Sequence, residues 1–71
     1  MARIASFKAE ARYDFGIGRF LWQLAKEDVC QQFDTWRKAE NPKILSIDFG
    51  RIKSGSLSGS NSEYIRVLYD A

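Results

Sequence analysis

The stretch that decides the fold is ASFKAEARYDF, which runs from Ala5 to Phe15. Apolar and polar residues alternate along all of it, with a period of two. That period is typical of a β-strand with one buried and one solvent-facing side. We therefore predict a strand over about residues 3–15. Its inward side holds Ala5, Phe7, Ala9, Ala11, Tyr13 and Phe15, and its outward side holds Ser6, Lys8, Glu10, Arg12 and Asp14.

A helix over residues 4–15 is the competing interpretation of this stretch. Ile4, Phe7, Ala11 and Phe15 also fall on one helical stripe, and alanine favours helices. The strand is preferred because all eleven residues of the stretch match alternation, whereas four match the stripe.

The period changes after Phe15, where Gly16 and Gly18 interrupt the alternation. From residue 18 to 39 apolar residues recur every three or four positions, which predicts an amphipathic helix that ends before Pro42. The predicted stripe of this helix consists of Leu21, Leu24, Ala25, Val29, Phe33 and Trp36. Alternation returns over residues 43–52 and 63–70, so two more strands follow, joined by a Ser/Gly-rich loop over 54–62. In the first of these, Leu45, Ile47 and Phe49 share one face.

The order strand, helix, strand, strand predicts a single α+β domain over residues 1–71. A helical crossover makes the first two strands parallel, and a short loop makes the last strand antiparallel to the one before it. We expect a mostly antiparallel three-stranded sheet of order 1-3-2, counting predicted strands along the chain, with the helix on one face. The first strand then lies on an edge. The last strand is apolar on both sides and is expected to be the most buried.

The composition narrows the chemistry. The 71 residues include no histidine, which removes the commonest general base and a common zinc ligand. Cys30 is the single cysteine, so no disulfide can form within the chain, and without a histidine partner we interpret it as a structural residue. We therefore predict no enzyme activity, no metal and no cofactor. We also expect a cytoplasmic protein, because no signal-peptide pattern and no run of roughly 18 apolar residues occurs.

Two features suggest anion binding. The turn Gly16–Gly18 lies between a predicted strand and helix with Arg19 beside it, where phosphates bind in other folds. The dinucleotide motif would need a third glycine at Leu21, so a tight turn is the preferred interpretation. Arg51 and Lys53 flank the Ser/Gly loop and form a second candidate. A net charge of +2 is too small to indicate nucleic acid by itself.

The segment YIRVLY, from Tyr64 to Tyr69, resembles the late strand of RelE-like ribonuclease toxins, in which an arginine lies between apolar strand residues. The resemblance covers six residues, and the helical hairpin of those toxins has no counterpart here. It implies RNA cleavage as an alternative function. Arg66 and Tyr69 are the two residues for which the resemblance raises the question of a functional role.

We predict a non-catalytic protein-binding module that occupies a surface of a larger macromolecule. Small inhibitors, adaptors and phage-encoded anti-host proteins act in this way, which is an analogy. Ten aromatic residues are also many for a core of this size, and exposed Trp or Tyr is typical of interfaces. A second copy is a further candidate partner, through the edge of the first strand. The predicted surface consists of Lys8, Glu10, Arg12, Asp14, Trp22 and Tyr64, and the alternative, nucleic-acid contact, uses Arg19, Arg51 and Lys53.

Overall fold

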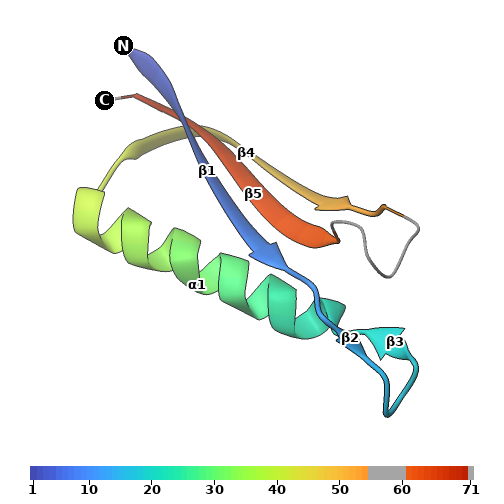
Figure 1. Ribbon diagram of the computed structural model, residues 1–71. Helices are drawn as coiled ribbons and strands as arrows, with labels where there is room; N and C mark the ends of the chain where they lie inside the picture. Colours follow the sequence, from blue (N-terminus) through green and yellow to red (C-terminus); the bar gives the residue numbers. More distant parts are fainter. Residues whose placement is uncertain (55–60, 71) are drawn as a thin grey trace.

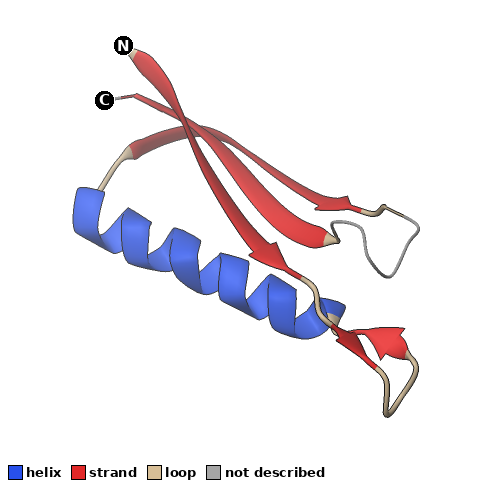
Figure 2. Cartoon of the chain, in the orientation of Figure 1, coloured by secondary structure: helices blue, strands red, loops and turns tan. Residues whose placement is uncertain are grey.

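The computed structural model describes residues 1–54 and 61–70. A helix packs on one face of a three-stranded sheet, and a small hairpin projects from one end (Figures 1 and 2). The predicted α+β class is therefore confirmed. In chain order the elements are β1 (Ala2–Glu10), β2 (Tyr13–Asp14), β3 (Arg19–Phe20), α1 (Trp22–Glu40), β4 (Lys43–Ile52) and β5 (Ser62–Asp70).

The long strands lie in the order β1-β5-β4, and β5 is antiparallel to both neighbours. The last strand thus occupies the middle and β1 an edge. The numbering differs from the predicted 1-3-2 because β2 and β3, which were not predicted, form a separate hairpin. Residues 55–60 of the predicted Ser/Gly loop lie outside the described residues, and β5 begins at Ser62, inside the predicted loop.

The core forms where α1 crosses β1 and β5. Ile65 and Val67 of β5 have no exposed surface, and Val29 of α1 packs against them. No Cα atom of α1 lies within 8 Å of one in β4, so the helix covers two of the three strands. Toward the C-terminal end of α1 the core continues as a cluster of four aromatic rings, formed by Phe7, Phe33, Trp36 and Tyr69. The centroids of the contacting rings lie 5.0–6.2 Å apart.

The first strand is shorter than predicted, because β1 ends at Glu10 and the chain then enters the hairpin. The carboxylate of Asp14 accepts hydrogen bonds from the backbone amides of Gly16 and Ile17, at 2.8 and 3.3 Å. Gly18, at a positive φ of 69°, donates its amide to the Asp14 carbonyl at 2.8 Å. A side chain that bonds amides two and three residues ahead stabilises a turn. The alternation continues as far as Phe15, inside this hairpin, so the pattern does not reveal that β1 ends at Glu10.

Two predictions about neighbouring residues are wrong for the same reason. Phe15 was expected on the buried side but lies in the hairpin turn with 82% of its surface exposed. The helix begins at Trp22 rather than near residue 18, because Arg19 and Phe20 pair with β2 instead.

Leu24, expected in the buried stripe, is 59% exposed. A helical interpretation of residues 4–15 is excluded by β1.

The end of the helix agrees with the prediction. Asn41 adopts the left-handed conformation, with φ 45°, and its amide donates to the Arg37 carbonyl at 2.9 Å. Asparagine is one of the residues that tolerate this conformation best. Pro42 follows and cannot continue the helix.

A bulge shifts the phase of β4. Ile44 lies opposite Tyr69 and Ser46 opposite Leu68, so Leu45 has no partner on β5. Leu45 was predicted to share a face with Ile47 and Phe49, but Ile44 takes that place because the bulge inserts one residue.

Candidate functional site

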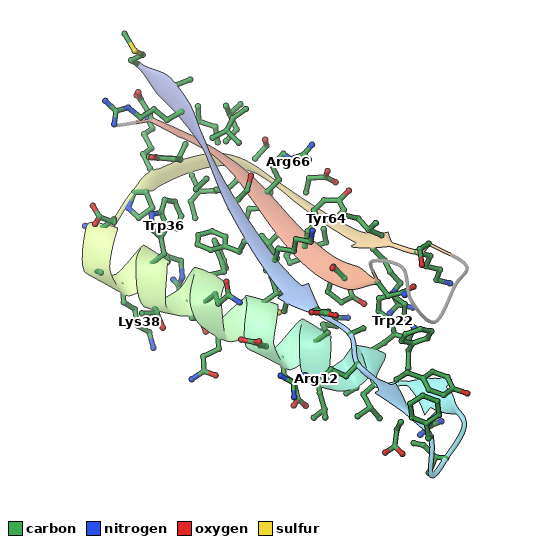
Figure 3. All side chains as sticks on the ribbon, in the orientation of Figure 1. Arg12, Trp22, Trp36, Lys38, Tyr64 and Arg66 are labelled. Carbon is green, nitrogen blue, oxygen red and sulfur yellow. The ribbon has the colours of Figure 1, made fainter. Side chains whose placement is uncertain are left out.

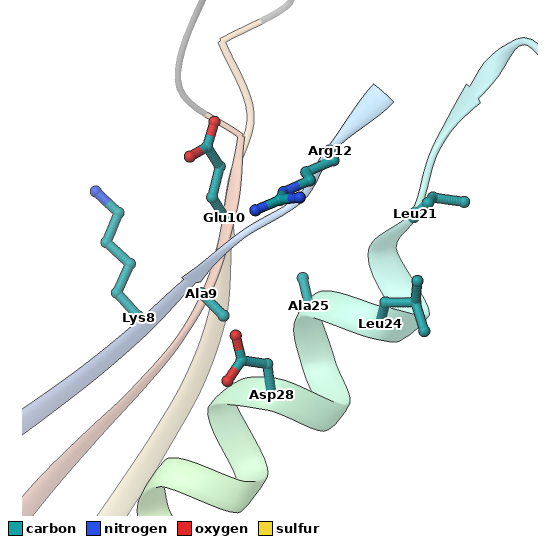
Figure 4. A pocket seen from close by; sticks show the side chains of 8 residues that line it. All are labelled: Lys8, Ala9, Glu10, Arg12, Leu21, Leu24, Ala25 and Asp28. Carbon is teal, nitrogen blue, oxygen red and sulfur yellow. The ribbon is translucent and has the colours of Figure 1, made fainter. Parts of the chain in front are cut away.

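A groove of about 410 Å³ separates the end of β1 from the first half of α1 (Figure 4). One wall is the strand and the segment after it, and the other is the helix and the residue before it. The lining residues are Lys8, Ala9, Glu10, Arg12, Leu21, Leu24, Ala25 and Asp28. Three of the six residues predicted for protein binding, Lys8, Glu10 and Arg12, therefore line one groove.

Small residues form the floor of this groove. Ala9 of β1 and Ala25 of α1 are buried, at 4% and 3% exposure, and belong to the hydrophobic core. Their short side chains leave open the space that larger residues would fill. Leu24 lies on the rim and is mostly exposed, so the groove has an apolar edge that no described residue covers.

The groove runs along the free edge of β1. Among the described strands, β5 is the single neighbour of β1, so the opposite edge is unpaired. The Lys8 carbonyl accepts a hydrogen bond from Nε2 of Gln32 at 3.1 Å, and the Arg12 carbonyl accepts one from the Leu21 amide at 2.8 Å. Both carbonyls therefore point toward the helix. Because alternate residues of a strand direct their amide and carbonyl groups to the same edge, those of Glu10 point there too.

The rim of the groove carries charges of both signs. Lys8, Glu10 and Arg12 are exposed on the strand side, and Asp28 is exposed on the helix side. Asp28 accepts a hydrogen bond from Gln32 at 3.3 Å. Within residues 1–54 and 61–70, none of these four charged side chains forms an ion pair. A partner that enters the groove would therefore meet ions that have no counter-ion of their own.

The other three residues predicted for protein binding lie elsewhere. Asp14 is engaged in the hairpin turn described above. Trp22 begins α1 and lies against Arg51, whose guanidinium carbon is 4.2 Å from the indole centroid. Tyr64 lies on the face of the sheet away from α1, where its ring covers Gly50. The structure therefore does not bring the six residues together on one surface.

The basic residues proposed for anion contact are also divided. Arg51 forms an ion pair with Glu63 at 2.6 Å, so the carboxylate of Glu63 neutralises the charge of Arg51. Arg19, Lys26 and Arg51 line a second groove, of about 670 Å³, in which the aromatic residues are Tyr13, Phe20 and Trp22. Lys53 is exposed and does not line it.

The residues singled out by the toxin resemblance do not converge. Tyr69 packs on Trp36 at a centroid distance of 5.0 Å, on the helix side of β5. Arg66 is an odd number of positions away along the strand, so its side chain lies on the other face. The guanidinium of Arg66 lies 5.5 Å from the centroid of the Tyr64 ring (Figure 3).

Sequence reasoning missed the helix wall of the first groove. Leu21 and Leu24 were assigned to a buried stripe, and Asp28 and Gln32 were given no role. The spacing of four between Asp28 and Gln32 indicates that they share a helix face, but nothing in the pattern indicates which strand lies beside that face. Cys30 is half-buried and packs against the core as a free thiol.

Among residues 1–54 and 61–70, no three histidine, cysteine, aspartate or glutamate side chains gather closely enough to hold a metal ion. No helix of the described part of the chain is long and apolar enough to cross a membrane. Comparison with known proteins finds no match: no family model, no curated protein and no solved structure is significantly similar to this chain.

Proposed function

We propose that this protein is a non-catalytic protein-binding module that takes an extended segment of its partner into the groove between β1 and α1. The observation that carries the proposal is the position of an unpaired strand edge beside an apolar groove with charged rims. A segment added to β1 as a fourth strand would bond its backbone to the free edge and insert alternate side chains between strand and helix. This is one of the recurrent modes of peptide recognition.

Different contacts would supply the affinity and the specificity of binding. Backbone hydrogen bonds to the edge are independent of sequence, whereas the groove selects side chains. Leu24 and the alanine floor favour a small apolar side chain in the groove. Lys8 and Arg12 on one rim and Asp28 on the other favour a partner that carries both charge signs. Gln32, which bonds the Lys8 carbonyl, would have to release that group for the added strand to extend past it.

The test is a selection of peptides from a random displayed library on the folded protein, followed by amide NMR of the complex. Strand addition is expected to shift the amide signals of Lys8 and Glu10. Leu24→Asp is expected to weaken binding about tenfold or more, because a buried leucine contact contributes about 1.5–3 kcal/mol. Aspartate is favourable in the first helical turn, so this variant is expected to fold. Leu45→Asp, which alters a leucine of similar exposure on β4, is the matched control and is expected to bind normally.

Backbone methylation of a selected peptide separates strand addition from other modes. Methylation of the amides that face β1 is expected to abolish binding, and methylation of the alternate amides is expected to leave it unchanged. Equal sensitivity at consecutive amides, or signal shifts confined to other parts of the molecule, would contradict the proposal.

Nucleic-acid binding is a second candidate, favoured by the groove in which Arg19, Lys26 and Arg51 lie with Trp22. Cations beside an aromatic ring are the usual elements of a single-strand binding surface. Arg19→Glu together with Lys26→Glu would then abolish binding of a short single-stranded RNA at low salt. A wild-type protein that shows no retention on heparin and no RNA shift would remove this candidate.

A further inference from the structure

The far edge of the sheet, opposite the groove, is formed by β4. This strand pairs with β5 on one side, and no described strand pairs with its other side. Because α1 does not cover β4, Ile47 and Phe49 are 39% and 60% exposed, although both side chains lie on the face of the sheet that α1 packs against. Ile52 is 42% exposed at the end of the strand. A long edge strand with apolar side chains is a template for pairing with another strand.

The two edges of the sheet differ. The β1 edge is partly occupied, since Gln32 bonds its Lys8 carbonyl and charged side chains follow one another along it. On β4 the single charge between Lys43 and Arg51 is Asp48, and Arg66 lies directly opposite it on β5. Arg51 is itself paired with Glu63. Both charges between Ser46 and Ile52 on β4, Asp48 and Arg51, therefore already lie opposite a residue of the opposite charge on β5.

The bulge determines how much of β4 can pair regularly. Between Ile44 and Ser46 the register shifts, and from Ser46 to Ile52 every residue has one partner on β5 without interruption. This regular stretch runs from residue 46 to residue 52, and its midpoint is Phe49. An antiparallel pair of identical strands related by a two-fold axis at Phe49 would therefore use the whole regular stretch.

The side chains fit this symmetry. With the axis at Phe49, the ring meets its copy, Asp48 lies opposite Gly50, and Ile47 lies opposite Arg51. No like charges are opposed. Moving the axis by one residue to Asp48 would place two carboxylates directly opposite each other, which destabilises a strand pair. An axis at Ile47 would run into the bulge.

We propose that β4 pairs with β4 of a second copy about a two-fold axis at Phe49 and forms a continuous six-stranded sheet. The axis is perpendicular to the sheet, so both copies of α1 lie on the same face and flank the paired β4 strands. The two Phe49 rings pack against each other there, on a surface that neither helix covers. This inference goes beyond the proposed function, because the β1 groove lies on the opposite edge and remains open in both copies.

The oligomeric state tests the proposal. Sedimentation equilibrium at micromolar concentrations is expected to give twice the chain mass of 8.2 kDa. Phe49→Lys is expected to raise the dissociation constant about thirtyfold or more, as loss of an interface hot spot does. Phe15→Lys, at another exposed phenylalanine, is the matched control and is expected to stay dimeric. Circular dichroism verifies that both variants fold.

Disulfide trapping identifies the edge and the register. In a Cys30→Ser background, Phe49→Cys is expected to crosslink to its copy at a protein concentration that offsets loss of the Phe49 ring, because facing residues of paired strands lie close enough for a disulfide. Ser46→Cys is expected to remain reduced, since its partner in this register is Ile52. Ser6→Cys, at the midpoint of β1, reports pairing through the other edge. A wild-type protein that is monomeric at all concentrations overturns the proposal, as does a dimer that crosslinks at Ser6 and tolerates Phe49→Lys.

Discussion

Replacing Gly50 with alanine is expected to destabilise the protein because of one neighbour, Tyr64. On the face of the sheet away from α1, a methyl group at Gly50 would overlap Cζ, Cε2 and Oη of the Tyr64 ring. Gly50 and Tyr64 lie directly opposite each other on β4 and β5. An aromatic ring that covers a glycine on the adjacent strand compensates for the missing side chain.

The magnitude follows from two opposed terms. Overpacking of a close contact costs about 1–3 kcal/mol. Alanine is better than glycine inside a strand by roughly 0.5–1 kcal/mol. We therefore expect Gly50→Ala to lower the free energy of unfolding by about 1 kcal/mol, within a range of about 0–2.5 kcal/mol. In a Tyr64→Ala background the overlap is gone, and the same substitution is expected to raise the free energy of unfolding by roughly 0.5–1 kcal/mol.

Urea unfolding of the four proteins of this double-mutant cycle measures the two values. Far-UV circular dichroism reports unfolding, because emission from Trp22, which lies beside Arg51, would overlap that of Trp36. A change of sign between backgrounds would show that Tyr64 packs on Gly50. An equal cost in both backgrounds would refute this reasoning and would leave the Tyr64 side chain free for a partner.

Four further substitutions test the core, the helix end and the partly buried ion pair between Arg51 and Glu63. Ile65→Ala is expected to cost about 2–5 kcal/mol in urea unfolding, since this side chain has no exposed surface; that is a large part of the roughly 4–10 kcal/mol expected for a domain of this size. Asn41→Ala is expected to lower the melting temperature, because the left-handed conformation costs an alanine about 1–2 kcal/mol. Asn41→Gly is expected to leave the melting temperature nearly unchanged, since glycine adopts this conformation freely. Glu63→Gln is expected to cost about 1–2 kcal/mol and to change Trp22 emission, because the guanidinium over that indole loses its carboxylate partner. Unchanged emission would indicate that Arg51 holds its position without Glu63.

Much of the architecture was predictable because single residues carry unambiguous signals. Ile65 and Val67 on one side of the last strand and Leu68 on the other indicated a central position, and β5 lies there. Pro42 marked the end of the helix. Ile65 and Val67 are fully buried under α1, whereas Leu68 on the other face is 36% exposed, so the helix-facing side of β5 carries the signal. Pro42 marks the helix end because it has no amide donor.

The errors occur where neighbouring elements share a period. The residues from Tyr13 to Phe15 continue the alternation of β1, so the first half of the hairpin is hidden in a strand pattern. A bulge such as that at Leu45 leaves no local mark, and one inserted residue exchanges the two faces of a strand. The groove was missed on its helix side because Leu24 and Asp28 acquire their role from the strand that lies beside them. Tertiary packing, which a single sequence does not display, decides all three.

The place of β5 in the sheet also has a consequence for folding. Among the described strands, β1 and β4 each pair only with β5, and Ser62–Asp70 follows both of them in the chain. During synthesis, neither β1 nor β4 can complete a sheet until this segment has left the ribosome. Folding must then close long loops before the core is formed, which favours a slow, all-or-none transition. Until that moment, the apolar residues of β1 and β4 remain exposed to chaperones and to other nascent chains.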